Sequence, residues 1–167
     1  PELERAEIER AKRKPTESLD AYDHYLRGLA SAYRLANRQA CEEALRLFRK
    51  AIELDPNFAS AYSFAAVSYT WAKTNGWSSI TPNDIAEVKK LAQRAVELGK
   101  DDVIALAASG YAKAFVARDL EGGAALIERA LALNSNSADG WFWGGWMKNW
   151  LGESEAAISR FARALRL

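Results

Sequence analysis

Four near-copies of one short stretch recur along the chain and decide its fold. Each runs from a basic residue through an alanine toward a helix end, and the first three continue into a polar turn: KAIELDPN at 50–57, RAVELGKD at 94–101, RALALNSN at 129–136 and RALRL at 163–167. Their alanines, Ala51, Ala95, Ala130 and Ala164, are spaced 44, 35 and 34 residues apart. A period near 34 is typical of a solenoid of helical hairpins. One hairpin cannot bury its own apolar face, so the copies are expected to stack.

Composition places the chain among globular domains and excludes several other classes. Of its 167 residues 49% are hydrophobic, and 23 Lys and Arg residues nearly balance 22 Asp and Glu residues, for a formal net charge of +1. A core of that size supports folding, and the lack of a basic block argues against nucleic acid or an anionic membrane as partner. No apolar run reaches the roughly 18 residues that a membrane span needs. We therefore expect a protein or peptide partner.

Residue types that carry chemistry are scarce. One cysteine, Cys41, and one histidine, His24, give no zinc-binding set, and the sequence has no glycine-rich phosphate loop or nucleophile with its base. We expect no enzyme activity, no metal and no cofactor, and we assign Cys41 to helix surface or packing. A lone cysteine indicates a reducing, cytoplasmic location. The chain starts without Met and stops within a repeat, so we expect a piece of a longer protein.

Apolar residues recur with helical rather than alternating spacing. A charged leading segment, 1–15, is expected to be helical over 2–14, and Ser18 is expected to cap the first repeat helix. Thr81 and Asp84 have the spacing of a capping box. The predicted fold is all-α, a right-handed superhelical solenoid of four hairpins at about 16–56, 57–100, 101–135 and 136–167. The expected helices span about 19–36, 40–54, 58–73, 83–98, 102–117, 120–133, 138–150 and 153–166.

Small and large apolar residues follow the order W-x2-L-G-x2-Y and then A-x3-F. The first half is matched by Leu26-x2-Leu29-Ala30-x2-Tyr33, Tyr62-x2-Ala65-Ala66-x2-Tyr69, Leu106-x2-Ser109-Gly110-x2-Lys113 and Trp141-x2-Gly144-Gly145-x2-Lys148. The second half is matched by Ala44-x3-Phe48, Val88-x3-Ala92, Gly123-x3-Ile127 and Ala157-x3-Phe161. The pattern resembles the tetratricopeptide repeat (TPR) family over about residues 19–167, with two extra residues inside the first repeat and about ten inside the second. The resemblance implies a non-catalytic interaction scaffold.

Four segments also resemble the C-terminal repeat regions of bacterial class III adenylate cyclases and of bacterial winged-helix transcription regulators. They are KPTESLDAYDHYLRGL (14–29), LFRKAIELDPNFASAY (47–62), NGW (75–77) and ALIERALALNSNSADGWFWGGW (125–146). In those proteins a catalytic or DNA-binding domain precedes the repeats, and none of its motifs is present here. The resemblance implies the regulatory part of a bacterial signalling protein such as a cyclase. The alternative is a self-association or spacer module of a winged-helix regulator.

In TPR proteins the partner lies in a concave groove lined by the first helix of each hairpin. Carried over to this sequence, the first-repeat groove residues are His24, Arg27, Ser31 and Arg34. Those of the second repeat are Ser60, Ser63, Val67, Thr70 and Trp71, and those of the third are Ala107, Tyr111, Ala114 and Phe115. The fourth repeat contributes Asp139, Phe142, Trp146, Asn149 and Trp150. The groove is thus expected to grade from basic to aromatic.

The expected helix 138–150 carries more aromatic residues than one face can hold. Trp141 matches the buried tryptophan of the repeat and is expected in the core. Phe142, Trp146 and Trp150 are spaced by four, and their stripe is expected to abut a similar stripe formed by Tyr111 and Phe115. So large an apolar cluster needs a cover. The open alternatives are a peptide partner, the segment 2–14, a following repeat or a second copy of the chain.

Two polar clusters have simple explanations. His24 beside Arg27 and Arg34 could bind a carboxylate, but such a trio is more often a solvated face. Two acidic pairs stand at helix starts, where acids complement the helix dipole. Capping therefore explains these pairs better than a metal site does: Asp101 with Asp102, and Asp119 with Glu121.

Overall fold

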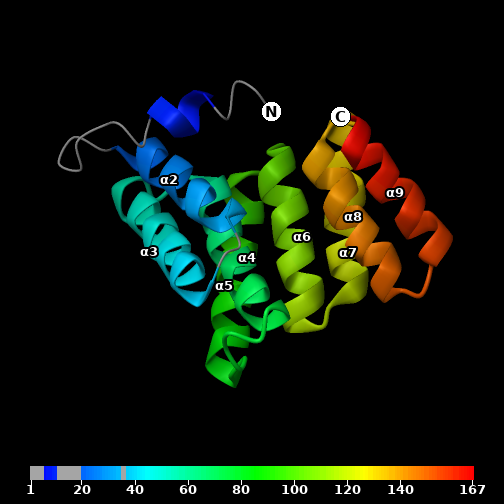
Figure 1. Ribbon diagram of the computed structural model, residues 1–167, viewed down its shortest axis with the longest axis horizontal. Helices are drawn as coiled ribbons and strands as arrows, with labels where there is room; N and C mark the ends of the chain where they lie inside the picture. Colours follow the sequence, from blue (N-terminus) through cyan, green and yellow to red (C-terminus); the bar gives the residue numbers. More distant parts are fainter. Residues whose placement is uncertain (1–5, 11–19, 35–36) are drawn as a thin grey trace.

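The computed structural model of this chain describes residues 6–10, 20–34 and 37–167, and over these ranges it contains helices and turns but no strand. Residues 6–10 are helical. Figure 1 shows the further helices as a curved row. No helix within the described ranges is long and apolar enough to cross a membrane. The helix bounds are α2 Ala21–Tyr33, α3 Arg38–Leu54, α4 Ala59–Thr74, α5 Pro82–Leu98, α6 Val103–Ala117, α7 Leu120–Leu133, α8 Ala138–Trp150 and α9 Ser154–Arg166.

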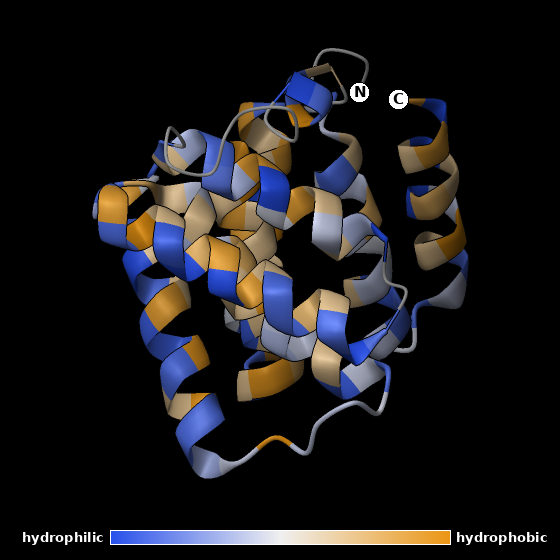
Figure 2. Ribbon diagram, turned by 60° about the vertical axis from the view of Figure 1, so that its left-hand side comes forward, coloured by the Kyte–Doolittle hydropathy of each residue, from blue (hydrophilic) through white to orange (hydrophobic). Residues whose placement is uncertain are grey.

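Consecutive helices pair as four hairpins: α2 with α3, α4 with α5, α6 with α7, and α8 with α9. The second helix of each hairpin also packs against the first helix of the next hairpin, and α6 packs directly on both α4 and α8. Figure 2 shows hydrophobic residues mainly on the helix sides that face other helices. Stacking buries the face that a single hairpin would leave in water. The predicted all-α, right-handed solenoid of four hairpins is confirmed.

Polar side chains explain where several helices begin. Thr81 and Asp84 form the predicted capping box, in which each side chain accepts a hydrogen bond from the backbone N–H of the other, and Pro82 is the first residue of α5. Asp102 caps α6, and Asp119 caps α7, by accepting from backbone N–H groups two or three residues further on. Those N–H groups have no partner within their own helix. The capping interpretation of these two acids is confirmed.

The first repeat helix starts later than expected. Ser18 lies outside the described residues, and the cap of α2 is Asp20. The Asp20 carboxylate accepts from the backbone N–H of Asp23, and the Asp23 carboxylate accepts from the backbone N–H of Asp20. This reciprocal arrangement fixes the first turn at Ala21.

Glycines at one repeat position let the two helices of a hairpin approach closely. A Cβ atom on Gly110 would lie 2.6 Å from the backbone oxygen of Gly123. A Cβ atom on Gly145 would lie 2.6 Å from the ring of Phe161. Both glycines stand eight residues after their helix caps. A larger side chain at this position would hold the two helices apart.

The spacing of eight residues between helix cap and small residue shows that the first repeat was matched to the TPR pattern in the wrong register. Gly28 also stands eight residues after its cap, and a Cβ atom there would lie 2.6 Å from the ring of Phe48. Gly28, rather than Ala30, therefore occupies the small-residue position. This two-residue shift makes the link between the helices of the first repeat four residues longer than in the fourth, instead of two.

The second repeat carries the expected long connection between its helices, at residues 75–81. The Asn75 side chain donates to the carbonyl oxygen of Trp71 at 2.9 Å. Gly76 has a φ of +68°, in the left-handed region that glycine adopts without steric cost. The backbone N–H of Trp77 then donates to the carbonyl oxygen of Ala72 at 2.8 Å, which ties the turn to the end of α4.

The described part of the leading segment packs on the first hairpin. Ile8 is buried in the core, and the Tyr22 hydroxyl donates to the Glu7 carboxylate at 2.5 Å. The Arg10 guanidinium lies 3.2 Å from the buried Asp23 carboxylate. Figure 1 shows residues 6–10 beside α2, at the opposite end of the row from α9. Over these residues, the leading segment is not the cover of the aromatic end.

Candidate partner-binding surface

Aromatic rings fill the inner side of the stack. The ring centroids are 5.8 Å apart for Tyr25 and Phe64, and 5.9 Å apart for Phe64 and Trp143. They are 6.2 Å apart for Trp143 and Tyr111. These four buried residues come from α2, α4, α8 and α6. Ring pairs at such separations attract one another beyond their burial alone. The cluster therefore joins hairpins that are distant in sequence.

This packing overturns most of the predicted groove in the middle repeats. Ser63, Val67 and Thr70 on α4 are fully buried, and so are Ala107 and Ala114 on α6. The physical reason is that α6 lies directly against both α4 and α8, so these sides of the first helices face one another. Their assignment to a partner-binding groove is wrong, because they offer no surface that a partner can touch.

The two ends of α4 differ in what they expose. Ser60 is buried, and its hydroxyl donates to the Asp102 carboxylate at 2.7 Å, which ties α4 to the start of α6. Its assignment to the groove is therefore wrong as well. Trp71 is half-buried, with its ring 6.2 Å from that of Phe64. Of the residues predicted for the second repeat, only Trp71 keeps a sizeable accessible surface.

His24 faces its own hairpin instead of a groove. Its side chain is buried. Burial, and then the positive charges of Arg27, Lys50 and Arg46, lower the pKa of His24 below its ordinary 6.5. Lys50 and Arg46 belong to α3, so the imidazole lies toward the second helix of the first repeat. Both predicted interpretations of His24, a carboxylate-binding residue of the groove and a solvated face, are therefore corrected.

The other three residues predicted in the first repeat are scattered. Arg27 and Ser31 are half-buried and Arg34 is exposed. The two-residue register shift is the reason, because the prediction carried the groove positions to the wrong side of α2. After the shift, the positions equivalent to Ser60, Ser63, Val67 and Thr70 are Tyr22, Tyr25, Leu29 and Ala32. A basic end of the groove is therefore absent from this part of the described chain.

Four aromatic rings form a continuous row from the C-terminal end of α6 along α8. The centroids are 4.9 Å apart for Phe115 and Trp150, 6.3 Å for Trp150 and Trp146, and 6.5 Å for Trp146 and Phe142. We call these four residues the aromatic ladder. Tyr111 stacks on Trp150 at 5.3 Å, so the predicted contact between the two stripes is confirmed. Trp146 and Phe142 remain 38% and 45% exposed.

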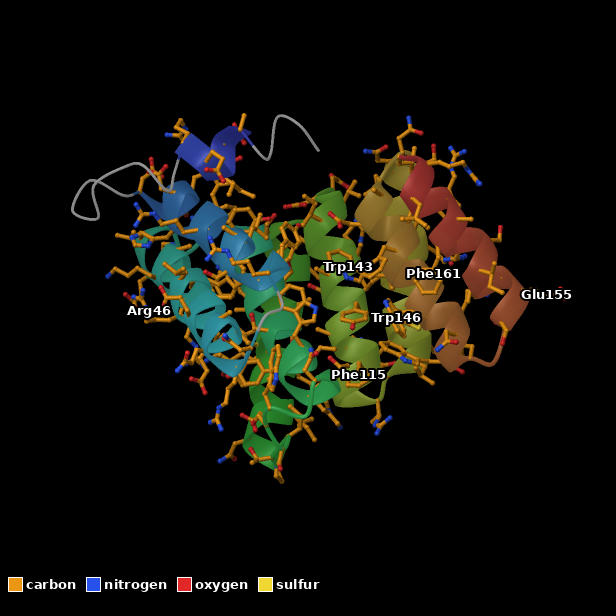
Figure 3. The ribbon with its side chains drawn as sticks, in the orientation of Figure 1. Arg46, Phe115, Trp143, Trp146, Glu155 and Phe161 are labelled. Atoms are coloured by element: carbon orange, nitrogen blue, oxygen red, sulfur yellow. The ribbon has the colours of Figure 1, made fainter. Side chains whose placement is uncertain are left out.

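Trp146 is placed differently from the prediction that it faces a groove between hairpins. Besides its neighbours in the ladder, its ring contacts Phe161 of α9, with centroids 5.6 Å apart. Figure 3 shows Trp146 and Phe161 near one another within the fourth hairpin. Phe142 also contacts Phe161, at 5.8 Å. Phe161 matches the core position of the repeat pattern, and its support of the exposed end of the ladder could not be predicted from that pattern because it depends on the packing of α9 on α8.

The remaining residues singled out on α8 are peripheral to the ladder. Trp141, expected in the core, is half-buried: its indole N–H donates to the carbonyl oxygen of Ser135 at 2.8 Å, and the Arg160 guanidinium lies 5.7 Å from its ring. Asp139 is half-buried and Asn149 is exposed. Trp141 therefore helps to hold the turn before α8.

One cation stands at the start of the ladder. The Lys73 ammonium, at the end of α4, lies 5.7 Å from the ring centroid of Phe115, within the range of a cation–π contact. Burial raises the pKa of Tyr111 to about 12, so its hydroxyl stays protonated at neutral pH. No sequence pattern indicates this role of Lys73, because only the packing of α4 on α6 brings it to Phe115. The ladder is thus an apolar row with a positive charge at its Phe115 end.

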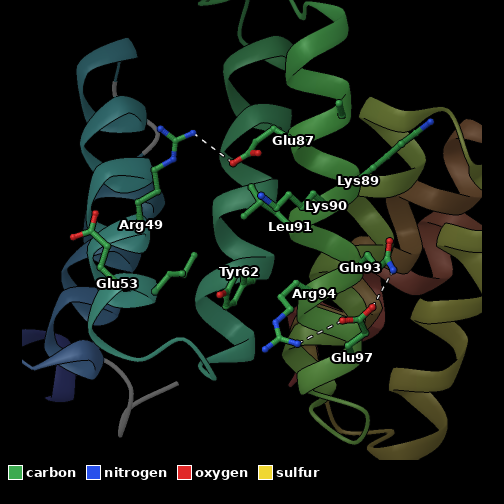
Figure 4. Close-up of a pocket in the computed structure, with 12 residues that line it drawn as sticks. Arg49, Glu53, Tyr62, Glu87, Lys89, Lys90, Leu91, Gln93, Arg94 and Glu97 are labelled. Carbon is green, nitrogen blue, oxygen red and sulfur yellow. Dashed lines mark hydrogen bonds and ion pairs between the residues drawn. The ribbon is translucent and has the colours of Figure 1, made fainter.

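A charged groove of about 880 Å³ lies between α3 and α5 (Figure 4). Its lining includes the apolar residues Ile52, Tyr62 and Leu91. Acids and bases alternate around it and pair across 3.8 and 3.6 Å: Arg49 with Glu87, and Arg94 with Glu97. Because the groove is lined by both acids and bases, it does not favour a ligand of either charge. The ladder is therefore the better candidate for a binding surface.

Cys41 has a structural position. It is buried, its thiol donates to the carbonyl oxygen of Ser68 at 3.3 Å, and burial raises its pKa, so the unreactive protonated form is favoured. Its assignment to packing is confirmed. Within the described ranges, no three His, Cys, Asp or Glu side chains are grouped so that they could hold a metal ion.

Comparison with known proteins gives structural likeness only. No protein-family model matches this chain, and no curated protein sequence matches it. Among solved structures, MamA 41-end from Desulfovibrio magneticus RS-1 is similar over 99% of this chain and 93% of its own, with a TM-score of 0.55 and 19% identity. The structure of the MamA RS-1 ArsTM double mutant is similar over 99% of this chain and 83% of its own, with a TM-score of 0.52 and 21% identity. This likeness supports a TPR-like helical solenoid.

Proposed function

We propose that this chain is a non-catalytic protein-interaction module that binds an amphipathic peptide along the aromatic ladder. The observation that carries the proposal is the exposure of Trp146 and Phe142 at the end of a row of touching rings. Fully burying one such side chain contributes roughly 1.5–3 kcal/mol, so a partner that covers both gains a large share of its binding free energy there. Tryptophan is also among the residues most often found at interface hot spots.

The surface also defines the chemistry of the partner. Phe115, Trp150 and Trp146 offer a rigid apolar track, and Lys73 adds a positive charge at one end. A helical peptide with apolar residues spaced by three or four matches such a track, and a carboxylate near one end matches the ammonium. Trp71 on α4 is half-buried and lies outside the ladder, and we include it as a further residue of the proposed binding surface. TPR-like scaffolds that act by binding other proteins are consistent with this use of the fold.

The setting of the module is proposed from sequence resemblance. The four segments quoted above support the regulatory C-terminal region of a bacterial signalling protein such as a class III adenylate cyclase, and the winged-helix regulator is the alternative. The single reduced cysteine supports a reducing compartment such as the cytoplasm. The sequence of the natural gene upstream of residue 1 distinguishes the two settings, because a cyclase domain and a winged helix carry different motifs. If the upstream sequence contains neither the cyclase motifs nor the winged-helix motifs, both proposed settings are wrong.

The peptide-binding proposal is tested by selecting peptides from a random library on the immobilised chain and measuring their affinity by fluorescence anisotropy. We expect enriched peptides with apolar residues at helical spacing. The Trp146→Ala variant is expected to weaken their binding about 30-fold, which corresponds to the roughly 2 kcal/mol typical of a hot spot. Leu54→Ala is the matched control, because Leu54 is similarly exposed at the far end of α3.

Two outcomes decide the proposal. Loss of binding in Trp146→Ala with unchanged helicity, and full binding in Leu54→Ala, supports the ladder as the site. Selected peptides that bind Trp146→Ala and Phe142→Ala as tightly as the unaltered chain contradict it. The Lys73→Glu variant refines the result, since it is expected to reverse any preference for an acidic residue at one end of the peptide.

A further inference from the structure

The outer face of α9 carries an apolar stripe that no described part of the chain covers. Ile158 is 67% exposed and Leu165 is 89% exposed, with Ala162 between them. The three residues are spaced by four and three, so they lie on one side of the helix. Phe161 lies instead toward α8, against Phe142 and Trp146. Figure 3 shows α9 at the free end of the molecule, with Glu155 at its outer edge.

The preceding hairpin shows how this fold treats the same position. Leu131 on α7 is the counterpart of Leu165, 34 residues earlier, and it is only 7% exposed. The side chain of Leu131 lies directly against Gly140 of α8, which covers it. A helix therefore fits onto this face of a hairpin, and no helix of the described residues covers the same face of α9.

The charges on α9 identify the occupant. Glu155 in the first turn and Arg166 in the last turn are both exposed and lie on the same flank of the stripe, and neither forms an ion pair with a described residue. We propose that a second copy of this chain packs its α9 against this one in antiparallel orientation. A twofold axis near Ala162 places Ile158 of each copy against Leu165 of the other. It also places each Glu155 opposite Arg166 of the other copy.

The helix geometry makes this arrangement self-consistent. The midpoint between Ile158 and Leu165 and the midpoint between Glu155 and Arg166 differ by one residue, or about 1.5 Å along the helix. The twofold rotation keeps each residue on its own flank, so the acid and the base meet on the same side of the interface. Ala162, at the centre, allows the two helices to approach closely. The stripe is therefore complementary to itself in both shape and charge.

Charge exchange within one chain tests the pairing. Sedimentation or light scattering between 1 and 100 µM is expected to show a dimer that dissociates on dilution, and Leu165→Glu is expected to be monomeric with unchanged helicity. Arg166→Glu and Glu155→Arg are each expected to weaken dimerisation at least tenfold, because like charges then face each other. The variant with both changes is expected to recover to within threefold of the original. Arg163→Glu, which has the same net charge as Arg166→Glu but lies off the stripe, is the control.

The rescue is specific because each single change also places a charge at the wrong end of its own helix dipole. In the double variant both charges interact unfavourably with the helix dipole. Recovery of its dimerisation affinity can therefore come only from restored ion pairs between the two copies. As a second measurement, Ala162→Cys in a Cys41→Ala background is expected to form a disulfide between copies under mild oxidation.

Several results overturn the proposal: an unaltered chain that stays monomeric at 100 µM, a dimer that survives Leu165→Glu, or a double variant as weak as the single ones. Each would assign the stripe to a different occupant, such as a foreign helix. This inference goes beyond the peptide-binding proposal and fails separately from it, because the monomeric Leu165→Glu variant is expected to keep the affinity of the aromatic ladder for selected peptides.

Discussion

The third and fourth hairpins, α6–α7 and α8–α9, share one repeat pattern, yet equivalent residues are buried in one and exposed in the other. Leu131 lies against α8, whereas its counterpart Leu165 has no helix over it in the described chain. Tyr111 is buried beneath Trp143 and Trp150, whereas its counterpart Trp146 keeps more than a third of its surface. Exposure here is decided by what stacks next, and not by residue type.

The side chains also differ in size at these positions. Ala107 of the third hairpin is replaced by Phe142 in the fourth, and Tyr111 is replaced by Trp146. The larger apolar residues of the fourth hairpin remain partly exposed, at 45% for Phe142 and 38% for Trp146, although the ring of Phe161 contacts both. Isolated exposed apolar residues need no explanation, but a contiguous patch of this kind marks an interaction surface. The comparison therefore supports an interface at the fourth hairpin.

The largest expected difference comes from the paired leucines. Leu131→Ala is expected to lower the free energy of unfolding by about 2–5 kcal/mol, because it removes buried methyl groups and leaves a cavity under α8. Leu165→Ala is expected to change it by less than about 0.5 kcal/mol. Urea unfolding followed by circular dichroism, at protein concentrations low enough to keep the chain monomeric, provides both values. Similar losses in the two variants would show that α9 is covered in solution within a single chain.

A smaller difference is expected for enlargement of the repeated alanines. Ala130 is fully buried, so Ala130→Leu is expected to destabilise the fold by about 1–3 kcal/mol through overpacking. Ala164, its counterpart on α9, is half-buried, and Ala164→Leu is expected to have a smaller effect because the end hairpin can shift outward. Thermal melting of both variants is the measurement. If Ala130→Leu melts with the unaltered chain, the tight crossing assigned to Ala130 is wrong.

Local sequence signals were sufficient for the helices of both hairpins. The bounds of α7 and α8 match the expected 120–133 and 138–150, because caps at Asp119 and Ser137 and turns at their ends are encoded within a few residues. Register within the first repeat was harder. Gly28 and Ala30 are both small, and only the close approach of Phe48 shows which of them lies at the helix crossing.

The groove could not be predicted from the repeat alone. Its predicted residues in the middle repeats are buried, and the contact between Phe64 and Trp143 joins hairpins nearly eighty residues apart in the chain. A repeat pattern specifies how one hairpin packs on the next, but the accumulated curvature decides whether the inner side stays open. The aromatic ladder was found because the i, i+4 spacing of Phe142, Trp146 and Trp150 is visible in the sequence. Lys73 and Phe161 join it only through tertiary packing.

The smallest expected effect concerns His24 of the first hairpin, a titrating side chain at a position where the third and fourth hairpins carry residues that do not titrate. His24 stands four residues after its helix cap, where Leu106 and Trp141 stand in the third and fourth hairpins. Its Nδ1 is buried and has no hydrogen-bond partner among the described residues, and its pKa is lowered by burial and by nearby bases. The folded chain therefore binds a proton less readily than the unfolded chain, whose histidine titrates near 6.5. Stability from this group is fully present above pH 6.5.

That stability is lost as the pH falls below 6.5, because the unfolded state then takes up more protons than the native state. We expect the free energy of unfolding to decrease between pH 7 and pH 5.5 in the unaltered chain, and to decrease less in His24→Leu, which places at this position the residue that α6 carries. Urea titrations at several pH values give the two slopes, and a proton NMR titration of the single histidine gives its pKa directly. Equal slopes, or a measured pKa of 6.5 or higher, would show that burial does not disfavour the protonated imidazole, and the comparison with Leu106 and Trp141 would then fail for the first hairpin.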